Sequence, residues 1–163
     1  MITKKGIRIS ILLIATTLSL SAQKLSGIYK VPDLMKRISA SDTTYIVNFW
    51  ATWCKPCMEE LQAIDSVGME NKTGKIKLLL VSLDFRDKKN QVNSALKSKG
   101  IQSSCVLLDE VNGNVYIDQI SPDWSGSIPA TLVKKGPRQV LLDKKLSSEQ
   151  LRTAIQKFES VPQ

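Results

Sequence analysis

TYIVNFWATWCKPCMEEL, residues Thr44–Leu61, is the stretch of the chain that decides the fold. Its first part, Thr44–Trp50, is rich in apolar, β-branched and aromatic residues, a pattern that predicts a buried strand. Two cysteines follow, separated by Lys55 and Pro56, and good helix formers come after them. We therefore expect a strand that delivers Cys54 to the start of a helix.

A C-x-x-C pair at such a junction is typical of a thiol–disulfide redox site. The positive end of the helix dipole and the free N–H groups would stabilise a thiolate on Cys54, and Lys55 adds positive charge beside it. Pro56 falls in the first helical turn, where its missing N–H costs little. A permanent structural disulfide is the alternative, but so short a loop removes little entropy from the unfolded chain. Cys54 is the candidate nucleophile and Cys57 the candidate resolving cysteine.

The motif F-W-A-x-W-C-x-x-C resembles the thioredoxin superfamily, and its residues here are Phe49, Trp50, Ala51, Trp53, Cys54 and Cys57. It resembles more closely the TlpA/ResA-like branch of extracytoplasmic thiol–disulfide oxidoreductases. That branch carries NFWATWC and a glutamate three residues after the second cysteine, and Asn48 and Glu60 match those positions. The resemblance implies an α/β protein of the thioredoxin fold, with a mixed central β-sheet flanked by helices on both faces.

Glu60 is the candidate proton acceptor, because it lies three residues after Cys57 and so on the same helix face. A partly buried carboxylate there could take the proton that Cys57 loses when it attacks a mixed disulfide. The alternative is an exposed glutamate in a surface pair, and Glu59 is expected to face solvent. Asn48 stands where thioredoxin proper carries a buried aspartate. It either increases the importance of Glu60 or is a hydrogen-bonded group beneath the site.

A second signature is Ile128–Pro129 at the start of a predicted strand, which resembles the cis-proline loop of this fold. The resemblance implies a cis bond beside the cysteines, with the Ile128 backbone pairing with an extended substrate segment. An ordinary trans proline is the alternative. Trp53 and Trp124 are expected to form an apolar rim for the substrate. Trp124 is equally compatible with packing in the core, where Trp50 is expected.

The composition is that of one globular domain, with 163 residues, 42% of them hydrophobic and 23% charged. The net charge is +8, but no Arg-rich block or aromatic-interleaved basic stripe predicts a nucleic-acid partner. The chain has no histidine, which excludes a Cys–His pair, a Ser–His–Asp triad and a Cys2His2 zinc site. The third cysteine, Cys105, is expected to be a buried, unreactive thiol, with an intermolecular or regulatory disulfide as the alternative.

Residues 1–22 are expected to be a secretory signal peptide. Lys4, Lys5 and Arg8 form a positive start, and Ile9–Leu20 is an apolar run too short for a comfortable membrane span. We expect cleavage before Gln23, and an uncleaved anchor is the alternative. In both cases residues 23–163 form one thioredoxin-like domain in an oxidising compartment, the bacterial periplasm, with transient membrane association as a further expectation.

Apolar periodicity and turn residues predict the remaining elements, which alternate between strands and helices before a final antiparallel hairpin and helix. The strands are expected at residues 44–50, 77–83, 105–108, 130–134 and 139–142, after a poorly specified extended arm at residues 24–30. The helices are expected at residues 32–39, from the cysteines to about Val67, at 88–99 and 115–120, and from a Ser147 or Ser148 cap to about Phe158.

These observations predict a thiol–disulfide oxidoreductase that uses the Cys54–Cys57 dithiol, with no cofactor beyond that redox-active disulfide. The resemblance to the TlpA/ResA-like branch implies that it acts as a reductase of specific protein disulfides. By resemblance, a membrane thiol carrier would supply the electrons, and apocytochrome c haem-site thiols are one candidate substrate. An oxidase or isomerase is the alternative within enzymes. A soft-metal chaperone for Cu(I) or zinc is less favoured, because two thiolates make an incomplete site. A non-catalytic binding module would leave the intact WCKPC unexplained.

Overall fold

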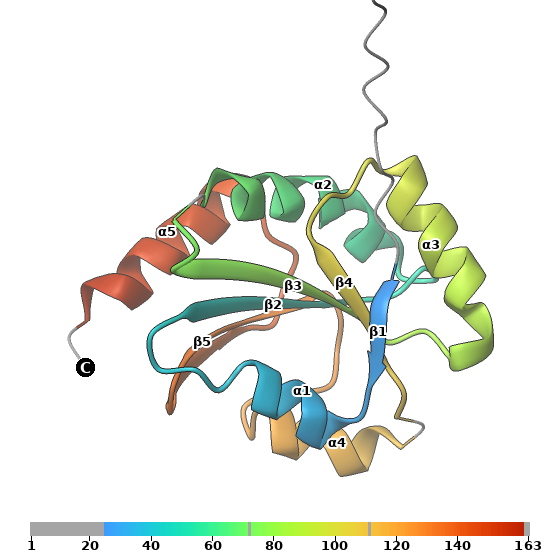
Figure 1. Cartoon of the computed structure of the whole chain (residues 1–163), viewed down its shortest axis with the longest axis horizontal. Coiled ribbons are helices and arrows are strands. Elements are labelled where there is room, and N and C mark those ends of the chain that lie inside the picture. Colours follow the sequence, from blue (N-terminus) through green and yellow to red (C-terminus); the bar gives the residue numbers. More distant parts are fainter. Residues whose placement is uncertain (1–24, 72, 111, 162–163) are drawn as a thin grey trace, which may run out of the picture.

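The computed structural model describes residues 25–71, 73–110 and 112–161, and the predicted signal peptide and its cleavage site lie outside them. A central sheet runs through the molecule with helices packed on it (Figure 1). The strands are β1 Leu25–Tyr29, β2 Thr44–Trp50, β3 Ile76–Ser82, β4 Ser104–Leu108, β5 Ala130–Lys135 and β6 Arg138–Leu142. The helices are α1 Val31–Arg37, α2 Lys55–Glu70, the 3-10 turn η1 Arg86–Lys88, α3 Lys89–Ser98, α4 Gly113–Ile120 and α5 Ser148–Ser160.

The sheet has the strand order β1-β4-β3-β2-β5-β6. The first four strands in that order are mutually parallel, whereas β5 runs antiparallel to both β2 and β6. In β2, Phe49 lies opposite Val81 of β3 on one side and Ala130 of β5 on the other. The predicted mixed sheet is confirmed, and the strand that carries the motif lies at its centre. Because parallel strands end at one edge, the start of α2 lies beside the ends of β3 and β4.

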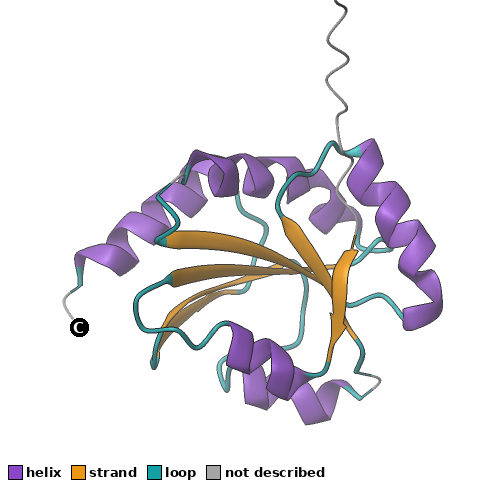
Figure 2. Ribbon diagram, viewed as in Figure 1, coloured by secondary structure: helices purple, strands orange, loops and turns teal. Residues whose placement is uncertain are grey.

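Helices cover both faces of the sheet, as predicted: α2, α3 and α5 lie on one face, and α1 and α4 on the other (Figure 2). The alternation of side chains along β2 follows this division. Ile46 and Trp50 belong to the core beneath α2, and Val47 and Phe49 to the core beneath α1. A strand buried on both faces needs a continuous apolar run, which β2 and β3 have. Over the described residues, none of the helices is long and apolar enough to span a membrane.

Several element ends differ from the predictions in instructive ways. The helix α2 continues to Glu70, beyond the expected end at Val67. It lies so close to β3 that a Cβ on Gly68 would come within 2.6 Å of the Leu78 side chain. The extended arm becomes the edge strand β1, which pairs in parallel with β4. Helix α5 begins at Ser148 with Ser147 as its N-cap, in a capping box with Gln150.

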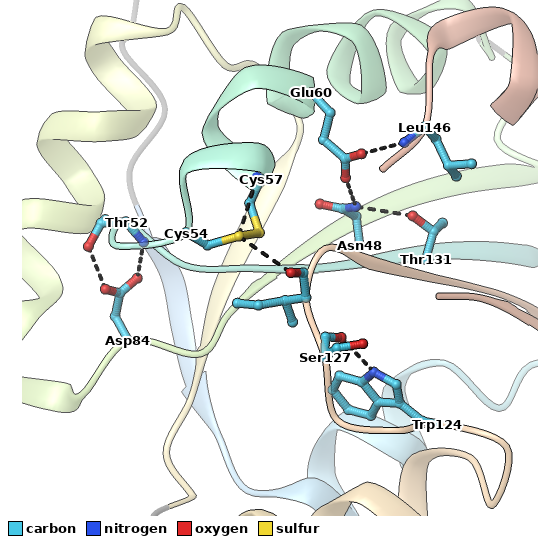
Figure 3. The surroundings of a disulfide bond; sticks show 11 residues. Asn48, Thr52, Cys54, Cys57, Glu60, Asp84, Trp124, Ser127, Thr131 and Leu146 are labelled. Carbon is cyan, nitrogen blue, oxygen red and sulfur yellow. Dashed lines mark hydrogen bonds between the residues drawn. A yellow bond between two sulfur atoms is a disulfide. The ribbon is translucent and has the colours of Figure 1, made fainter. Parts of the chain in front are cut away.

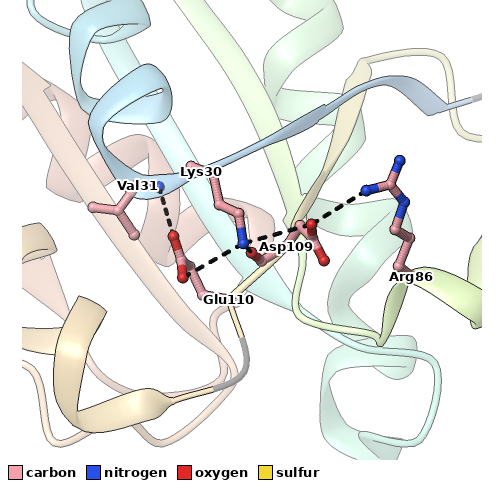
Figure 4. Close-up of polar contacts among 5 residues, drawn as sticks. All are labelled: Lys30, Val31, Arg86, Asp109 and Glu110. Atoms are coloured by element: carbon pink, nitrogen blue, oxygen red, sulfur yellow. Dashed lines mark hydrogen bonds and ion pairs between the residues drawn. The ribbon is translucent and has the colours of Figure 1, made fainter.

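A cluster of charged side chains ties the end of β1 to the end of β4 (Figure 4). Lys30 lies 3.5 Å from a carboxylate oxygen of Asp109 and 3.8 Å from one of Glu110, and Arg86 also pairs with Asp109 at 3.5 Å. These groups are partly exposed, so each pair contributes at most about 1 kcal/mol. Together they fasten the edge strand to the same end of the sheet that carries the cysteines.

Candidate active site

Cys54 and Cys57 form a disulfide at the start of α2, with an S–S distance of 2.02 Å (Figure 3). Cys54 is the N-cap of the helix, and its Sγ accepts a hydrogen bond from the Cys57 backbone N–H at 3.3 Å. Its exposed fraction is 5%, whereas Cys57 has no exposed surface. The strand β2 and the helix N-terminus thus leave a small exposed surface on Cys54 and bury Cys57 completely.

The Ile128–Pro129 peptide bond is cis, and it lies against this disulfide. The carbonyl oxygen of Ile128 is 3.6 Å from Cys54 Sγ. In the disulfide this sulfur carries no proton, so the contact is one of proximity, and in the dithiol form the Cys54 thiol can donate to that carbonyl. Pro129 directly precedes β5, which pairs with β2. The sheet therefore brings together the two sequence signatures.

The two tryptophans expected at the rim lie in different environments. Trp53 is 68% exposed directly before the nucleophile position, as a substrate rim requires. Trp124 is only 4% exposed, and its ring packs 4.6 Å from that of Phe49. Its indole N–H donates to the Ser127 carbonyl at 2.9 Å, so it supports the loop before Ile128 from within. This little exposed surface favours the core-packing alternative for Trp124, and Trp50 is buried as predicted.

Glu60 is buried in α2, three residues after Cys57, with 2% of its surface exposed. One carboxylate oxygen accepts from Asn48 Nδ2 at 2.9 Å, and the other accepts from the Leu146 backbone N–H at 2.6 Å (Figure 3). Asn48 Nδ2 also donates to Thr131 Oγ1 at 3.1 Å. The carboxylate is therefore held by β2 and by the segment that leads into α5. Among the two interpretations of Asn48, the structure favours a hydrogen-bonded group that contacts Glu60 directly.

Burial raises the pKa of Glu60 above its ordinary value, and this outweighs the opposing hydrogen bonds from Leu146 and Asn48 and the charge of Lys145. Its neighbour Glu59 is solvent-facing, as predicted, and pairs with Lys145 at 2.6 Å, which lowers the pKa of Glu59. Both glutamates line a hollow of about 380 Å³ together with Lys145 and Leu146. Glu60 is therefore a titratable group with a route to solvent away from the disulfide.

Asp84 is a buried carboxylate of the site that the sequence analysis missed. It follows β3 and accepts hydrogen bonds from the Thr52 backbone N–H at 2.9 Å and the Thr52 hydroxyl at 2.5 Å (Figure 3). The Ser82 hydroxyl donates to it at 2.8 Å. A signal was present in the sequence, because a charged residue directly after a continuous apolar strand lies at the edge where parallel strands end.

Cys105 is free and buried in β4, as predicted. Burial raises the pKa of its thiol to about 12, and the nearby Asp84 charge acts in the same direction. The group therefore stays protonated and unreactive at neutral pH. Within the part of the chain that the structure describes, no group of three or more cysteine, aspartate or glutamate residues is arranged to hold a metal ion.

Comparison with known proteins gives a family match over residues 23–133, to the AhpC/TSA family. Thiol:disulfide interchange protein DsbE of Pasteurella multocida is 32% identical over 69 residues, which cover 42% of this chain and 35% of that protein. The chain thus spans about a third of the length of this relative. Thioredoxin of Haemophilus influenzae is 32% identical over 91 residues, which cover 56% of this chain and 74% of that protein.

Among solved structures, a thioredoxin-related protein from Neisseria meningitidis serogroup B superimposes with a TM-score of 0.66. The superposition covers 78% of this chain and 91% of that one, at 21% sequence identity, so it shows the shared fold alone. The family match covers more than half of the chain, and the disulfide lies where the motif predicts it. The chain belongs to the AhpC/TSA family of thioredoxin-like proteins, and it carries a redox-type disulfide between Cys54 and Cys57.

Proposed function

We propose that this protein is an extracytoplasmic reductase of specific protein disulfides, and that it works through Cys54 and Cys57 without a bound cofactor. The observation that carries the proposal is the asymmetry of the pair. Cys54 caps a helix N-terminus and keeps a small exposed surface next to the exposed Trp53, whereas Cys57 is fully buried. A client can therefore react with the first sulfur only, and the second is kept for the step that releases the client.

In the first step the Cys54 thiolate attacks one sulfur of a client disulfide. A bond forms between Cys54 Sγ and that sulfur, the client S–S bond breaks, and the other client sulfur leaves as a thiolate that takes a proton from water. The Cys57 N–H, 3.3 Å from Cys54 Sγ, and the dipole of α2 stabilise the attacking thiolate. The product is a mixed disulfide between the client and Cys54.

In the second step Cys57 loses its proton to Glu60 and attacks Cys54 Sγ. The Cys54–Cys57 bond forms, the mixed disulfide breaks, and the client leaves with both of its sulfurs reduced. Glu60 suits this role because burial raises its pKa above its ordinary value and helix spacing puts it on the same face as Cys57. The hollow lined by Lys145 gives the proton an exit while the client still covers Cys54.

The client would lie across Trp53 and the Ile128–Pro129 loop. The Ile128 carbonyl lies 3.6 Å from Cys54 Sγ, so an extended client segment paired with this backbone would bring its sulfur to the nucleophile. Trp53 offers an exposed apolar surface beside it. Trp124 would contribute indirectly, by supporting the loop through Ser127.

The reducing direction is supported by the similarity to thioredoxin, a dithiol at the reducing end of the scale with a potential of about −270 mV. The predicted signal peptide supports a location outside the cytoplasm, the periplasm in bacteria. A protein there needs its dithiol restored from the membrane side, so we infer a membrane thiol donor. Apocytochrome c haem-site thiols are a candidate client.

The test is to capture clients in cells with the full chain carrying Cys57→Ser. This variant can form the mixed disulfide but not resolve it, so client adducts should accumulate as larger, dithiothreitol-sensitive species. Cys54→Ser/Cys57→Ser is the matched control, because it lacks the attacking sulfur and should give no adducts. Adducts that are equally abundant in the control, or absent from both, would contradict the proposed roles of the two cysteines.

A further inference from the structure

Asp84 lies beneath the turn that delivers the nucleophile. After β2 the chain makes a tight turn, in which the Cys54 backbone N–H donates to the Ala51 carbonyl at 3.1 Å. Thr52 is the first central residue of this turn, and it donates both its backbone N–H and its hydroxyl to Asp84. The turn is therefore closed by its own backbone hydrogen bond, and its central residue Thr52 is held by one carboxylate from the segment that follows the neighbouring strand β3.

The carboxylate is itself held rigidly. The Ser82 hydroxyl donates to it at 2.8 Å, and the Asp84 backbone N–H donates back to Ser82 Oγ at 3.1 Å. Directly before it, the Leu83 N–H donates to the Trp50 carbonyl at 2.8 Å, which extends the pairing of β3 with β2. The anchor for the turn thus lies directly after the end of β3, in a segment that its own hydrogen bonds to Ser82 and the backbone pairing of Leu83 hold in place.

Asp84 is buried, and hydrogen bonds hold it in place of an ion pair. Its exposed fraction is 2%, and no lysine or arginine of the described residues forms an ion pair with it. A buried charge is costly unless hydrogen bonds compensate it, and three of the donors here come from only two residues, Thr52 and Ser82. Two of these three donors belong to the turn, so the carboxylate is committed mainly to holding it.

We propose that Asp84 is a positioning residue for the redox pair. It fixes the Ala51–Cys54 turn through Thr52 and so holds Cys54 in the position from which it can join Cys57. This inference rests on the proposed redox function of the two cysteines. Asp84 acts through Thr52: it positions the turn, and it is not a reacting group in the exchange.

The consequence is a stabilised disulfide and a lower reduction potential. The relevant equilibrium is protein dithiol plus glutathione disulfide giving protein disulfide plus two glutathione thiols, which transfers two electrons from the protein. A looser turn lowers the effective concentration of one thiol near the other and shifts this equilibrium toward the dithiol.

The experiment measures this equilibrium constant for the purified full chain and for variants of the anchor. Asp84→Ala should lower the constant about tenfold, which corresponds to a potential about 30 mV higher. Thr52→Val, which loses the hydroxyl but keeps the N–H, should lower it about threefold, and Thr52→Ser should restore it. In the Asp84→Ala background, Thr52→Val should have no further effect, because the hydroxyl has lost its acceptor.

Asp87→Ala is the matched control, because Asp87 is an exposed acid on the same segment, paired with Lys88 at 3.6 Å. If Asp84→Ala does not fold, the comparison of Thr52→Val with Thr52→Ser decides the question, since Thr52 is only partly buried. If the equilibrium constants of the Asp84 and Thr52 variants equal those of wild type and Asp87→Ala, the positioning role of Asp84 is wrong, but the proposed function is not affected. A wild-type protein that exchanges no disulfide with glutathione would instead overturn the proposed function.

Discussion

Burial and hydrogen bonds act on the pKa of Glu60 in opposite directions, and the larger effect sets the direction of the shift. Two hydrogen bonds, from Asn48 and Leu146, favour the ionised carboxylate, and burial favours the neutral acid. Burial is the larger effect, so the pKa rises. The Asn48 amide donates to Glu60, and its own Oδ1 has no partner among the described residues. A rotation of this amide would let Oδ1 accept from a protonated Glu60, so the same pair can serve both protonation states.

We expect Glu60→Gln to change the pH dependence of stability. Below about pH 4.5 the wild-type glutamate is protonated in both the folded and unfolded chains and makes no difference. As the pH rises, the unfolded chain ionises first, so the wild type loses stability until the folded-state pKa is passed. Each pH unit between the two pKa values corresponds to about 1.4 kcal/mol. Urea unfolding from pH 4 to 8 should therefore show that the free energy of unfolding of Glu60→Gln increases relative to that of the wild type as the pH rises.

Glu59→Gln is the control for this measurement, because its pKa is lowered and not raised. Its pH trend should have the opposite sign, with the wild type gaining stability over the variant as the pH rises. Parallel pH profiles for wild type and Glu60→Gln would mean that the buried carboxylate has no raised pKa, and the proton-acceptor role would lose its basis.

At the residue scale, the site residues that belong to a local motif were predictable from the sequence, whereas contacts between residues distant in the chain were not. The cysteines, Glu60 and the Ile128–Pro129 signature are recognisable by spacing and resemblance. The apolar run before Asp84 indicates that this residue lies at an edge of the sheet, but its contacts with Thr52 form only when the ends of β2 and β3 are brought together. Trp124 was ambiguous because sequence does not show the direction of a side chain, and its packing on Phe49 resolves the ambiguity.

At the scale of elements, the start of α5 is coupled to the site. Leu146 donates its N–H to Glu60, and the next residue, Ser147, caps the helix by accepting from the Gln150 N–H at 3.2 Å. The helix then buries Leu151, Ile155 and Phe158. The cap therefore fixes both the direction in which α5 packs and the backbone group that binds Glu60.

Ser147→Ala should destabilise the protein by about 1 kcal/mol, because one donor at the helix start loses its partner. The matched control is Ser148→Ala, since Ser148 is the first helical residue and not the cap. It should stay within about 0.5 kcal/mol of wild type. Urea unfolding at neutral pH measures both, and equal losses for the two variants would show that the capping box does not hold α5.

Most elements were predictable because apolar periodicity is local, and β2 was predicted with its observed ends, Thr44 and Trp50. Pairing between distant segments was not. The arm before α1 was expected only to be extended, but it forms an edge strand because β4, some 80 residues later in the chain, offers it an unpaired edge. The extra turn of α2 after Val67 likewise depends on its packing against β3, through the close approach at Gly68.

At the scale of the whole molecule, two apolar cores on opposite faces of the sheet hold the fold together. The core beneath α2 extends from Ile46 of β2 to Ile155 of α5, and the other lies beneath α1 and α4. The ion pairs lie at the surface, such as Arg152 with Glu70 at 2.6 Å, which also joins α5 to α2. Surface pairs contribute little in water, so packing should dominate the stability.

A comparison of two variants that both loosen α2 tests this ranking. Leu61→Ala empties a fully buried site and should cost about 2–5 kcal/mol. Arg152→Ala removes the half-exposed pair with Glu70 and should cost far less than Leu61→Ala, and still less in molar salt. Denaturant titrations at low and high salt measure both effects. A larger loss from Arg152→Ala than from Leu61→Ala would contradict the account of the core.

The central claim is that Cys54 and Cys57 form a redox pair that gives electrons to clients, and the reduction potential of the purified protein tests it most directly. The measurement equilibrates the chain with glutathione and dithiothreitol buffers and quantifies the dithiol fraction. We predict a potential near or below that of thioredoxin, about −270 mV, at which the dithiol is an effective donor. A potential near −120 mV would mean that the protein takes electrons from its clients, and the proposed direction would be wrong.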